Sequence, residues 1–471
     1  MTNVTGAVDG AGQPASDRMT RSGIAWAALE CGRFPYVYLI SGTVFLPYFA
    51  SVVIGDPVSG QAKVAMLGKI AGIAAALTAP ILGASIDRIG PRKPLLAGGT
   101  IIMAILLSML WWAKPGDTGL PVWTILAVLV AITVLYAYTE VLHNSMLVRA
   151  SEGSGVSRLS AASFGLGYVA SLVVLVGVLW AFALPGQHDS AWLPAQPLFG
   201  LDPEKHENIR IVGPIAGALV ILALLPLLLF TRDHERSGIG LFAALRGGLA
   251  YLAQLPAHLR KHPNARTFII ACMFYRDGVV AMSLFIGVVA AGVMGWKLTE
   301  LLILGIMLII FSLFGSWIAV WLEERFESKR SVQIGLLMAV VFLTGLVGTS
   351  PTQIFFLGGD DPALLRPLWQ GGVLDTAPQL AFLFFAAAAD LSATIVATGS
   401  RALLVKITPP EETGAFFGLY SLVTTATAWL APLAIGYATV ATGSQRWGFA
   451  PVVGFFAIGF VLLSFVRQER R

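Results

Sequence analysis

Six ionisable side chains of this chain lie inside long apolar segments: Glu30, Arg33, Glu140, Arg276, Asp277 and Asp390. An ionisable group costs roughly 2.5–3.5 kcal/mol at the centre of a membrane helix, so each needs a partner or a watery cavity. A carboxyl group beside a cation can alternate between ion-paired and protonated forms, because desolvation favours the neutral form and the cation the charged one. A guanidinium can instead hold a carboxylate or phosphate through paired N–H donors. The six residues predict proton or anion binding, and the alternative is a set of static, mutually neutralising ion pairs.

A second polar feature is the turn at 83–93, which reads GASIDRIGPRK and lies between two apolar runs. Its carboxylate, Asp87, can accept from backbone N–H groups at a helix N-terminus and from nearby arginines. Glycines permit close backbone approach and positive φ. We interpret the turn as a latch that holds a neighbouring helix, and the alternative is a tight basic turn that only sets topology. The latch residues are Gly83, Asp87, Arg88, Gly90, Arg92 and Lys93.

The composition indicates a membrane protein. The 471 residues are 56% hydrophobic and 12% charged, with a mean hydropathy of +0.78. Soluble domains are about 25% charged. The apolar runs are roughly 20 residues long, which spans about 30 Å of hydrocarbon, and such runs must be helical because lipid offers the backbone no hydrogen-bond partners. Cys31 and Cys272 fit no metal spacing, and we expect no metal, cofactor or nucleic acid.

The apolar runs predict twelve spans. They are 26–54, 62–86, 95–113, 122–147, 160–184, 210–231, 267–293, 299–322, 331–350, 379–405, 415–441 and 447–466. The chain then divides into a polar, disordered tail (1–21), a six-helix bundle (22–231), a basic linker (232–266) and a second bundle (267–471). In the linker, 241–259 is amphipathic, so it is either a surface helix or a plain connection.

The distribution of Lys and Arg predicts the orientation. Cations gather in alternate connections, for example at Arg88, Arg260 and Lys329. The positive-inside rule then places both termini in the cytoplasm. The N-terminus lacks the pattern of a signal peptide. We expect a multi-pass protein of a bacterial inner membrane.

The two halves carry related motifs. Span five contains Phe164-Gly165-Leu166-Gly167-Tyr168, and span eleven contains Phe417-Gly418-Leu419-Tyr420. The connection after span eight keeps an acid and an arginine, Glu324 and Arg325, where the turn at 83–93 has Asp87 and Arg88. Two related bundles of six helices are typical of transporters built from parallel repeats.

These motifs resemble the major facilitator superfamily, and within it the "unknown major facilitator" group related to autophagy-linked vacuolar effluxers. The resemblance rests on Ala79-Pro80-Ile81-Leu82-Gly83 leading to Asp87-Arg88, Gly165-Leu166-Gly167-Tyr168, Tyr275-Arg276-Asp277-Gly278, Ser400-Arg401, Phe416-Phe417-Gly418-Leu419-Tyr420-Ser421 and Thr442-Gly443-Ser444-Gln445-Arg446. It implies an all-α membrane protein with the major facilitator fold, in which twelve transmembrane helices form two pseudo-symmetric six-helix bundles. It also implies secondary transport of a small solute by alternating access.

The resemblance assigns places to the embedded charges. In this superfamily spans one, four, seven and ten line the central cavity, and all six charges fall on those spans. We therefore expect one cluster of Glu30, Arg33 and Glu140 and a symmetry-related cluster of Arg276, Asp277 and Asp390. The turn at 83–93 is expected to latch the other bundle when the protein faces outward. The connection after span eight keeps Glu324 and Arg325 but lacks the glycines of this turn. We therefore expect an inner gate that is stronger on the N-terminal half.

One departure from the family bears on the substrate. Members tend to carry Tyr-Asp-Trp-Ala-Asn-Ser at the start of span one, where this chain has Leu29-Glu30-Cys31-Gly32-Arg33-Phe34. The cation at Arg33 replaces an amide and favours an anionic substrate, whereas the family's eukaryotic members resemble amino-acid exporters. We expect proton-coupled transport of an amino acid or small organic anion. The alternatives are a drug or metabolite exporter and a transport-inactive sensor on the same fold.

Four further residues are weaker candidates: Lys69, His143, Asn144 and Arg401. Lys69 can reach the interface by snorkelling. Asn144 matches a family Asn, and His143 stands where an aromatic residue is usual. A histidine can titrate near neutrality, but we favour a solvated hydrogen-bonding role for His143. Aromatic residues such as Tyr38 and Tyr136 are assigned to packing.

The sequence argues against an enzyme. It has no His-Glu-x-x-His zinc motif, no Gly-x-Ser-x-Gly elbow and no phosphate-binding Gly-Lys-Ser/Thr loop. The expected partners are a small-molecule substrate, protons and lipid, and we expect a monomer.

Overall fold

The computed structural model describes residues 19–151, 156–186, 192–233, 259–359, 362–370, 372–408 and 425–467, together with the single residues 243, 246, 416, 419, 420 and 422. The side chains of Asp87 and Arg88 lie outside this description, as do most of the predicted tail and of the amphipathic stretch 241–259. The regular elements of the described residues are helices.

The first span is a broken helix. It begins at Arg21, earlier than predicted, where the Thr20 side chain accepts the Gly23 N–H at 3.1 Å. Its pieces are α1 (Arg21–Ala27), α2 (Glu30–Tyr36), the π-helical turn η1 (Val37–Gly42), α3 (Phe45–Tyr48) and η2 (Phe49–Val53). Pro35 and Pro47 lie in α2 and α3, and prolines remove the backbone donors that a regular helix needs. The break therefore lies next to the charged residues of this span.

The remaining helices of the N-terminal half are close to the predicted spans. They are α4 (Pro57–Ile89), α5 (Lys93–Met109), α6 (Val122–Ser145), α7 (Leu147–Ala150), α8 (Val156–Val178), η5 (Leu179–Ala183), α9 (Glu207–Arg210) and α10 (Val212–Phe230). Short 3₁₀ turns lie at η3 (Leu110–Trp112), η4 (Gly116–Thr118) and η6 (Leu198–Gly200).

The C-terminal half contains α12 (Pro263–Val293), α13 (Leu298–Val347), η7 (Pro362–Leu365), α14 (Ala377–Ile407), α16 (Leu430–Thr442), α17 (Gln445–Phe449) and α18 (Pro451–Ser464). The 50-residue α13 contains a non-helical residue, Glu327, with φ 71°. An added Cβ at Gly315 would contact Leu391 of α14, and one at Gly335 would contact Val396 of the same helix. The chain therefore reverses at Glu327, and both arms pack against α14.

The span count agrees with the prediction as far as the description reaches. Ten helices of the described residues are long and apolar enough to cross a membrane, and α13 is one of them. Its two arms correspond to predicted spans eight and nine, and the connection predicted between them is the bend at Glu327. Span eleven is described as α16 and the few residues before it. Twelve spans are consistent with this arrangement.

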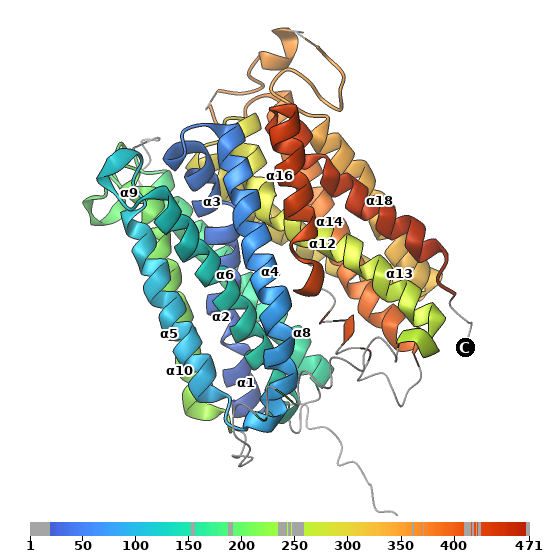
Figure 1. Cartoon of the computed structure of the whole chain (residues 1–471). Coiled ribbons are helices and arrows are strands. Elements are labelled where there is room, and N and C mark those ends of the chain that lie inside the picture. The colour runs from blue at the N-terminus through green and yellow to red at the C-terminus, as the bar shows by residue number, and fades with distance from the viewer. Residues whose placement is uncertain are drawn as a thin grey trace, which may run out of the picture.

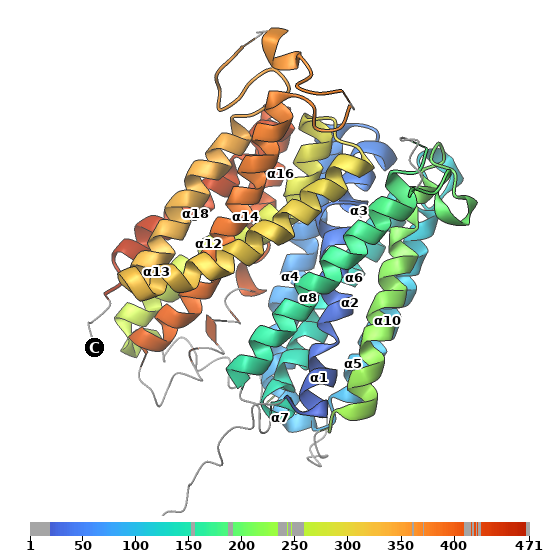
Figure 2. The ribbon, with the colours of Figure 1, turned by 180° about the vertical axis from the view of Figure 1, so that it is seen from behind.

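The helices form two groups that lie side by side. In both views α1–α10 lie on one side and α12–α18 on the other (Figures 1 and 2). We call the end that holds Arg21 and Ser464 the terminal end, and the opposite end, which holds Gly55 and Gly443, the far end. Between the groups α4 packs against α16, α12 against α3, and α13 against α8.

Polar contacts join the two halves at the far end. The Gln61 Nε2 donates to Thr439 Oγ1 at 2.8 Å and to the Gln445 carbonyl at 3.0 Å. The Gln445 Nε2 donates in turn to the Pro57 carbonyl at 2.6 Å. An added Cβ at Gly287 would lie 2.2 Å from the Gly42 carbonyl oxygen, so glycine at 287 is required for this close approach. The structure is therefore closed toward the far end.

Candidate functional site

Arg33 is the centre of a polar cluster in the N-terminal half. Its side chain is buried, and Nη1 lies 3.1 Å from Glu30 Oε1, one turn earlier on α2. Its Nη2 lies 3.8 Å from Glu140 Oε2 on α6, whose side chain is half exposed. The guanidinium also lies over the Tyr136 ring, 4.6 Å from its centroid. The structure thus brings together the three residues predicted for the first cluster.

His143, which we predicted only as a weaker candidate, belongs to the same cluster. Its side chain is fully buried, and Nδ1 lies 3.1 Å from Glu30 Oε1 and 3.5 Å from Arg33 Nη1. Its ring stacks on Trp26 with centroids 4.1 Å apart. The expectation of a solvated hydrogen-bonding histidine is wrong, because α6 directs this ring onto α1 and α2 rather than into water.

The cluster has unfilled hydrogen-bonding capacity. Among the described residues, the buried atoms Arg33 Nε, Arg33 Nη2 and Glu30 Oε2 have no hydrogen-bond partner, although Nη2 lies in ion-pair range of Glu140. Buried polar atoms without partners are rare and costly in folded proteins. Two donor atoms without hydrogen bonds on one guanidinium suit an anionic group of a ligand.

The three residues predicted for the second cluster do not form one. Arg276 donates from Nη1 to the Tyr420 hydroxyl at 2.6 Å and lies over the same ring. Asp277 accepts the Ala431 N–H at 2.8 Å, and Asp390 accepts from Ser312 Oγ at 2.5 Å. No ion pair among these three occurs in the described residues. Neighbours on a helix point about 100° apart, so Arg276 and Asp277 lie on different faces of α12.

Asp277 caps a helix of the neighbouring span. Its carboxylate, which is fully buried, accepts from Ala431 in the first turn of α16. The other carboxylate oxygen, Oδ1, has no hydrogen-bond partner among the described residues. The N-terminus of a helix carries partial positive charge, which favours an anion. Asp277 is therefore held by the start of α16 rather than by a cationic side chain.

Asp390 lies where the two halves meet. It accepts from Ser312 of α13, which is also hydrogen-bonded to Tyr168 of the N-terminal half, and Tyr38 of that half lies nearby. Tyr168 and Tyr420 end the related motifs of spans five and eleven, and each lies beside one of the predicted charges. That repetition was the signal that could have identified both tyrosines, whereas nothing in the sequence singled out Ser312.

The remaining weak candidates lie apart from the cluster. Asn144 is exposed, and Lys69 is half-buried on α4 and forms no hydrogen bond or ion pair within the described part of the chain. Arg401 of α14 lies over the Phe164 ring of α8, 5.3 Å from its centroid. This contact links the two halves toward the terminal end.

The turn at 83–93 is held by its own half of the protein. Arg92 Nη1 donates to the Ser145 carbonyl of α6, and Lys93 Nζ donates to the Leu228 carbonyl of α10 at 2.9 Å. Gly90 has φ 94°, as expected for its glycine, whereas Gly83 makes only an ordinary contact with Val141. For Gly83 the expectation of close approach is wrong. Asp87 and Arg88, the other predicted latch residues, have side chains outside the described part.

Asp233 completes this turn and supports a prediction about stability. Its carboxylate accepts the Arg92 N–H at 2.8 Å and the Lys93 N–H at 3.2 Å, at the first turn of α5. We expect Asp233→Ala to lower the free energy of unfolding by about 1–2 kcal/mol, the usual effect of losing a charged helix cap. Thermal unfolding in detergent would measure the change. Glu324→Ala, which removes an exposed acid at the same end, is the control, and an equal loss in both variants would contradict the capping role.

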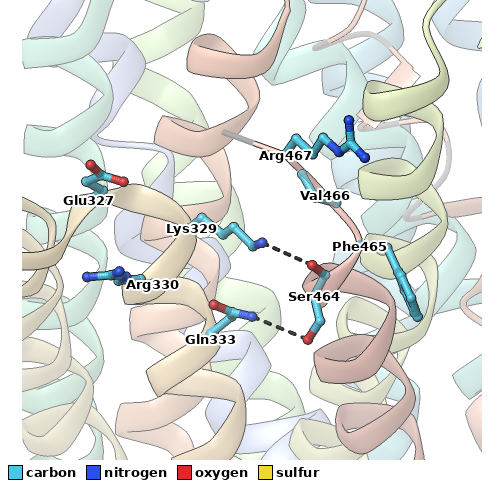
Figure 3. Close-up of a pocket in the computed structure, with 8 residues that line it drawn as sticks. All are labelled: Glu327, Lys329, Arg330, Gln333, Ser464, Phe465, Val466 and Arg467. Atoms are coloured by element: carbon cyan, nitrogen blue, oxygen red, sulfur yellow. Dashed lines mark hydrogen bonds between the residues drawn. The ribbon is translucent and has the colours of Figure 1, made fainter. Parts of the chain in front are cut away.

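A cavity of about 710 Å³ lies at the terminal end between α13 and α18. Lys329 Nζ donates to the Ser464 carbonyl at 3.0 Å, and Gln333 Nε2 faces Ser464 Oγ at 3.4 Å. Figure 3 shows Lys329 and Gln333 pointing toward Ser464, whereas Arg330 points the other way. The cations around this cavity do not converge on one point, so it lacks the arrangement of an anion site.

The chain resembles known transporters over most of its length. The uncharacterized MFS-type transporter YxiO of Bacillus subtilis is 22% identical over 461 residues, which cover 96% of each chain. The structure of a D-xylose-proton symporter matches with a TM-score of 0.62 and 13% identity, over 94% of this chain and 96% of that one. A mutant of the nucleoside transporter NupG matches with a TM-score of 0.61 and 13% identity, over 95% and 99%.

These likenesses confirm the predicted class and fold. The described helices have the major facilitator fold, the protein is a multi-pass membrane protein, and the proteins that match are transporters rather than enzymes. The family model described as "Vacuole effluxer Atg22 like" matches residues 148–471, more than half of the chain. The chain therefore belongs to the Atg22-like vacuole effluxer family.

Proposed function

We propose that this protein is a secondary active transporter that moves a small solute by alternating access, coupled to protons. The single observation that carries the proposal is the placement of charged side chains on spans one, four, seven and ten, with Glu30, Arg33 and Asp277 buried and Asp390 partly buried. Among them Asp390 is hydrogen-bonded to Ser312 and lies near Tyr38 and Tyr168 of the opposite half. A carboxyl group between two moving bundles changes its surroundings whenever the bundles move, which is what coupling of a proton to transport requires.

We propose an amino acid or a small organic anion as the substrate. The free N–H groups of Arg33 support an anionic group, and membership of the effluxer family is consistent with amino acids. The half-exposed Glu140 beside Arg33 keeps the cluster in contact with solvent. A drug or metabolite exporter remains the second candidate for the cargo, and a transport-inactive sensor the second candidate for the function.

We further propose that residues 22–231 and 267–471 move as two bundles joined by the linker 232–266. Both termini would then lie in the cytoplasm of a bacterial cell, with the protein a monomer in the inner membrane. In this orientation the far end faces outward, and the contacts of Gln61 and Gly287 close the outer side.

Counterflow in proteoliposomes tests the proposal. Vesicles loaded with an unlabelled mixture of amino acids and organic acids are diluted into each labelled compound in turn. A transporter accumulates the matching label transiently, whereas a sensor binds it without accumulation. Binding of a label without counterflow would therefore contradict the transport proposal and favour the sensor.

The closure at the far end gives a prediction. We expect Gly287→Ala to separate the halves there, because the new Cβ would overlap the Gly42 carbonyl and a backbone atom cannot move aside cheaply. Spin labels at Ser59→Cys and Thr442→Cys, in a background with Cys31→Ser and Cys272→Ser, should then report a distance several ångströms longer. Gly165→Ala is the matched control, since nothing lies within 4 Å of its added Cβ. An unchanged distance in Gly287→Ala would contradict the closure.

A further inference from the structure

The hydrogen-bonding pattern of His143 fixes where one of its protons lies. Its Nε2 is 2.9 Å from the Trp26 carbonyl oxygen, and the Trp26 indole N–H donates back to the His143 carbonyl at 2.9 Å. A carbonyl oxygen only accepts hydrogen bonds, so Nε2 must carry a hydrogen. The stacked Trp26 ring holds the imidazole in this orientation.

With Nε2 protonated, a neutral His143 would present a bare lone pair at Nδ1. That atom lies 3.1 Å from Glu30 Oε1, whereas the donor Arg33 Nη1 is farther away at 3.5 Å and already donates to Glu30. An ionised Glu30 also offers only lone pairs, so a neutral histidine and an ionised glutamate would face each other with no hydrogen between them. Both groups are buried, and a repulsive contact of this kind is costly without water to separate it.

We propose that Glu30 and His143 together bind one proton, held between Glu30 Oε1 and His143 Nδ1. The pair exists either as imidazolium with carboxylate or as neutral imidazole with carboxylic acid. Both forms contain one proton more than a neutral histidine with an ionised glutamate, and in both the 3.1 Å contact becomes a hydrogen bond. The bound proton forms an N–H bond at Nδ1 in the first form and an O–H bond at Glu30 in the second, and in both cases it is taken up from water and returned to it.

The charges around the pair favour this protonation state. The described titratable groups near it are Cys31 and Arg33 on its own helix and Glu140 and Tyr136 on α6. Arg33 is always cationic, and Glu140 is half exposed. With one bound proton, the positive and negative charges of the cluster balance. Without it, the cluster has a net charge of −1 inside the membrane span, where unpaired charge is costly.

The other helices packed on α2 add no compensating charge near the pair. At Gly32, α10 presents backbone and apolar atoms of Leu219, Val220 and Ala223. At Phe34, α8 presents the rings of Phe164 and Tyr168. Among the described neighbours, the charged side chains close to the pair are therefore Arg33 and Glu140.

The proposed proton site deepens the transport function of the same cluster, and its role in coupling rests on that function. The presence of the bound proton does not rest on the transport function, because it is inferred from the hydrogen-bonding pattern of His143 and Glu30. A spectroscopic test on the resting protein therefore separates the two: the proton can be present in a protein that fails counterflow, and absent in one that passes it.

The test counts the proton directly. Nitrogen-15 NMR of protein labelled at its histidines reports whether both ring nitrogens of His143 are protonated, and the signal is assigned by its loss in His143→Gln. Infrared difference spectra between wild type and Glu30→Gln report a carboxylic acid at Glu30. At neutral pH we expect either the nitrogen-15 signal of a doubly protonated His143 or the infrared signal of a carboxylic acid at Glu30. His206→Gln, which removes a histidine at the far end, is the control and should leave both signals in place.

Glu30→Gln provides a second arm if His143→Gln fails to fold. The glutamine amide can donate to Nδ1 of a neutral imidazole, so the contact is satisfied without an extra proton. We expect His143 to become neutral in this variant while the protein stays folded. An imidazole with a bare Nδ1 beside an ionised Glu30 in the wild type would overturn the proposal, as would an imidazolium that persists in Glu30→Gln.

Discussion

Concentrative transport is expected to be lost in Asp277→Asn and in Asp390→Asn, while the protein still folds. Asparagine keeps an oxygen that can accept from Ala431 in the first case and from Ser312 in the second, so the contacts at 2.8 Å and 2.5 Å survive. What each variant loses is the ability to bind and release a proton. Uptake against a gradient should fall to background, and counterflow, which needs no net proton movement, should persist.

The two aspartates differ in their surroundings, yet the same loss of accumulation is expected from both variants. Asp277 is fully buried, with one carboxylate oxygen lacking a partner, whereas Asp390 faces the tyrosines of the other half. Glu324→Gln, which neutralises an exposed acid, is the control for the lost charge and should transport normally. Normal accumulation up a gradient by either aspartate variant would remove that residue from the coupling mechanism.

Arg33→Gln is expected to destabilise the protein and to abolish transport. Its guanidinium is the cation beside buried Glu30, 3.1 Å away. Breaking a buried ion pair by removing one partner costs about 3–5 kcal/mol, and in this variant the buried Glu30 would keep only its contact with His143. Thermal unfolding in detergent should show this loss, and Arg401→Gln, at an exposed position, should show little.

The double variant Glu30→Gln/Arg33→Gln separates stability from function. Removing the charges of both Glu30 and Arg33 leaves neither side chain as a buried, unpaired ion. Most of the free energy of unfolding that Arg33→Gln loses should therefore be regained. Transport should not return, because the N–H donors for the substrate are gone. Arg33→Lys keeps the charge without the paired donors and should fold well yet bind substrate weakly. Full transport by the double variant would show that Arg33 is only a structural ion-pair partner.

The spans could be predicted because the thickness of the bilayer fixes their length. The helices from α4 to α12 follow the predicted ranges closely. The shape of the bend at Glu327 could not be predicted. A charged stretch between two apolar runs indicates a connection, but it does not show that the chain stays helical up to and directly after a single residue. The broken first span was only partly predictable, because its prolines indicate a bend and not the π-helical turns.

Part of the candidate site could be predicted from spacing. Glu30 and Arg33 are three residues apart and share one face of α2, as helical geometry requires. Glu140 was placed beside them by the family resemblance and not by its position in the sequence. The second cluster was predicted from the placement of its residues on spans seven and ten and from the symmetry of the two halves, neither of which fixes the direction of each side chain. The role of His143 depends on the packing of α6 against α1, which no local pattern encodes.

Proton movement in proteoliposomes tests the central claim most directly. Vesicles containing the protein and a trapped pH-sensitive dye are exposed to amino acids and small organic anions one at a time, without an imposed gradient. The account predicts that at least one of these solutes changes the internal pH with the wild type, and that Asp277→Asn and Asp390→Asn abolish the change. Solute exchange by counterflow with no movement of protons would contradict proton coupling, and the absence of both would contradict transport.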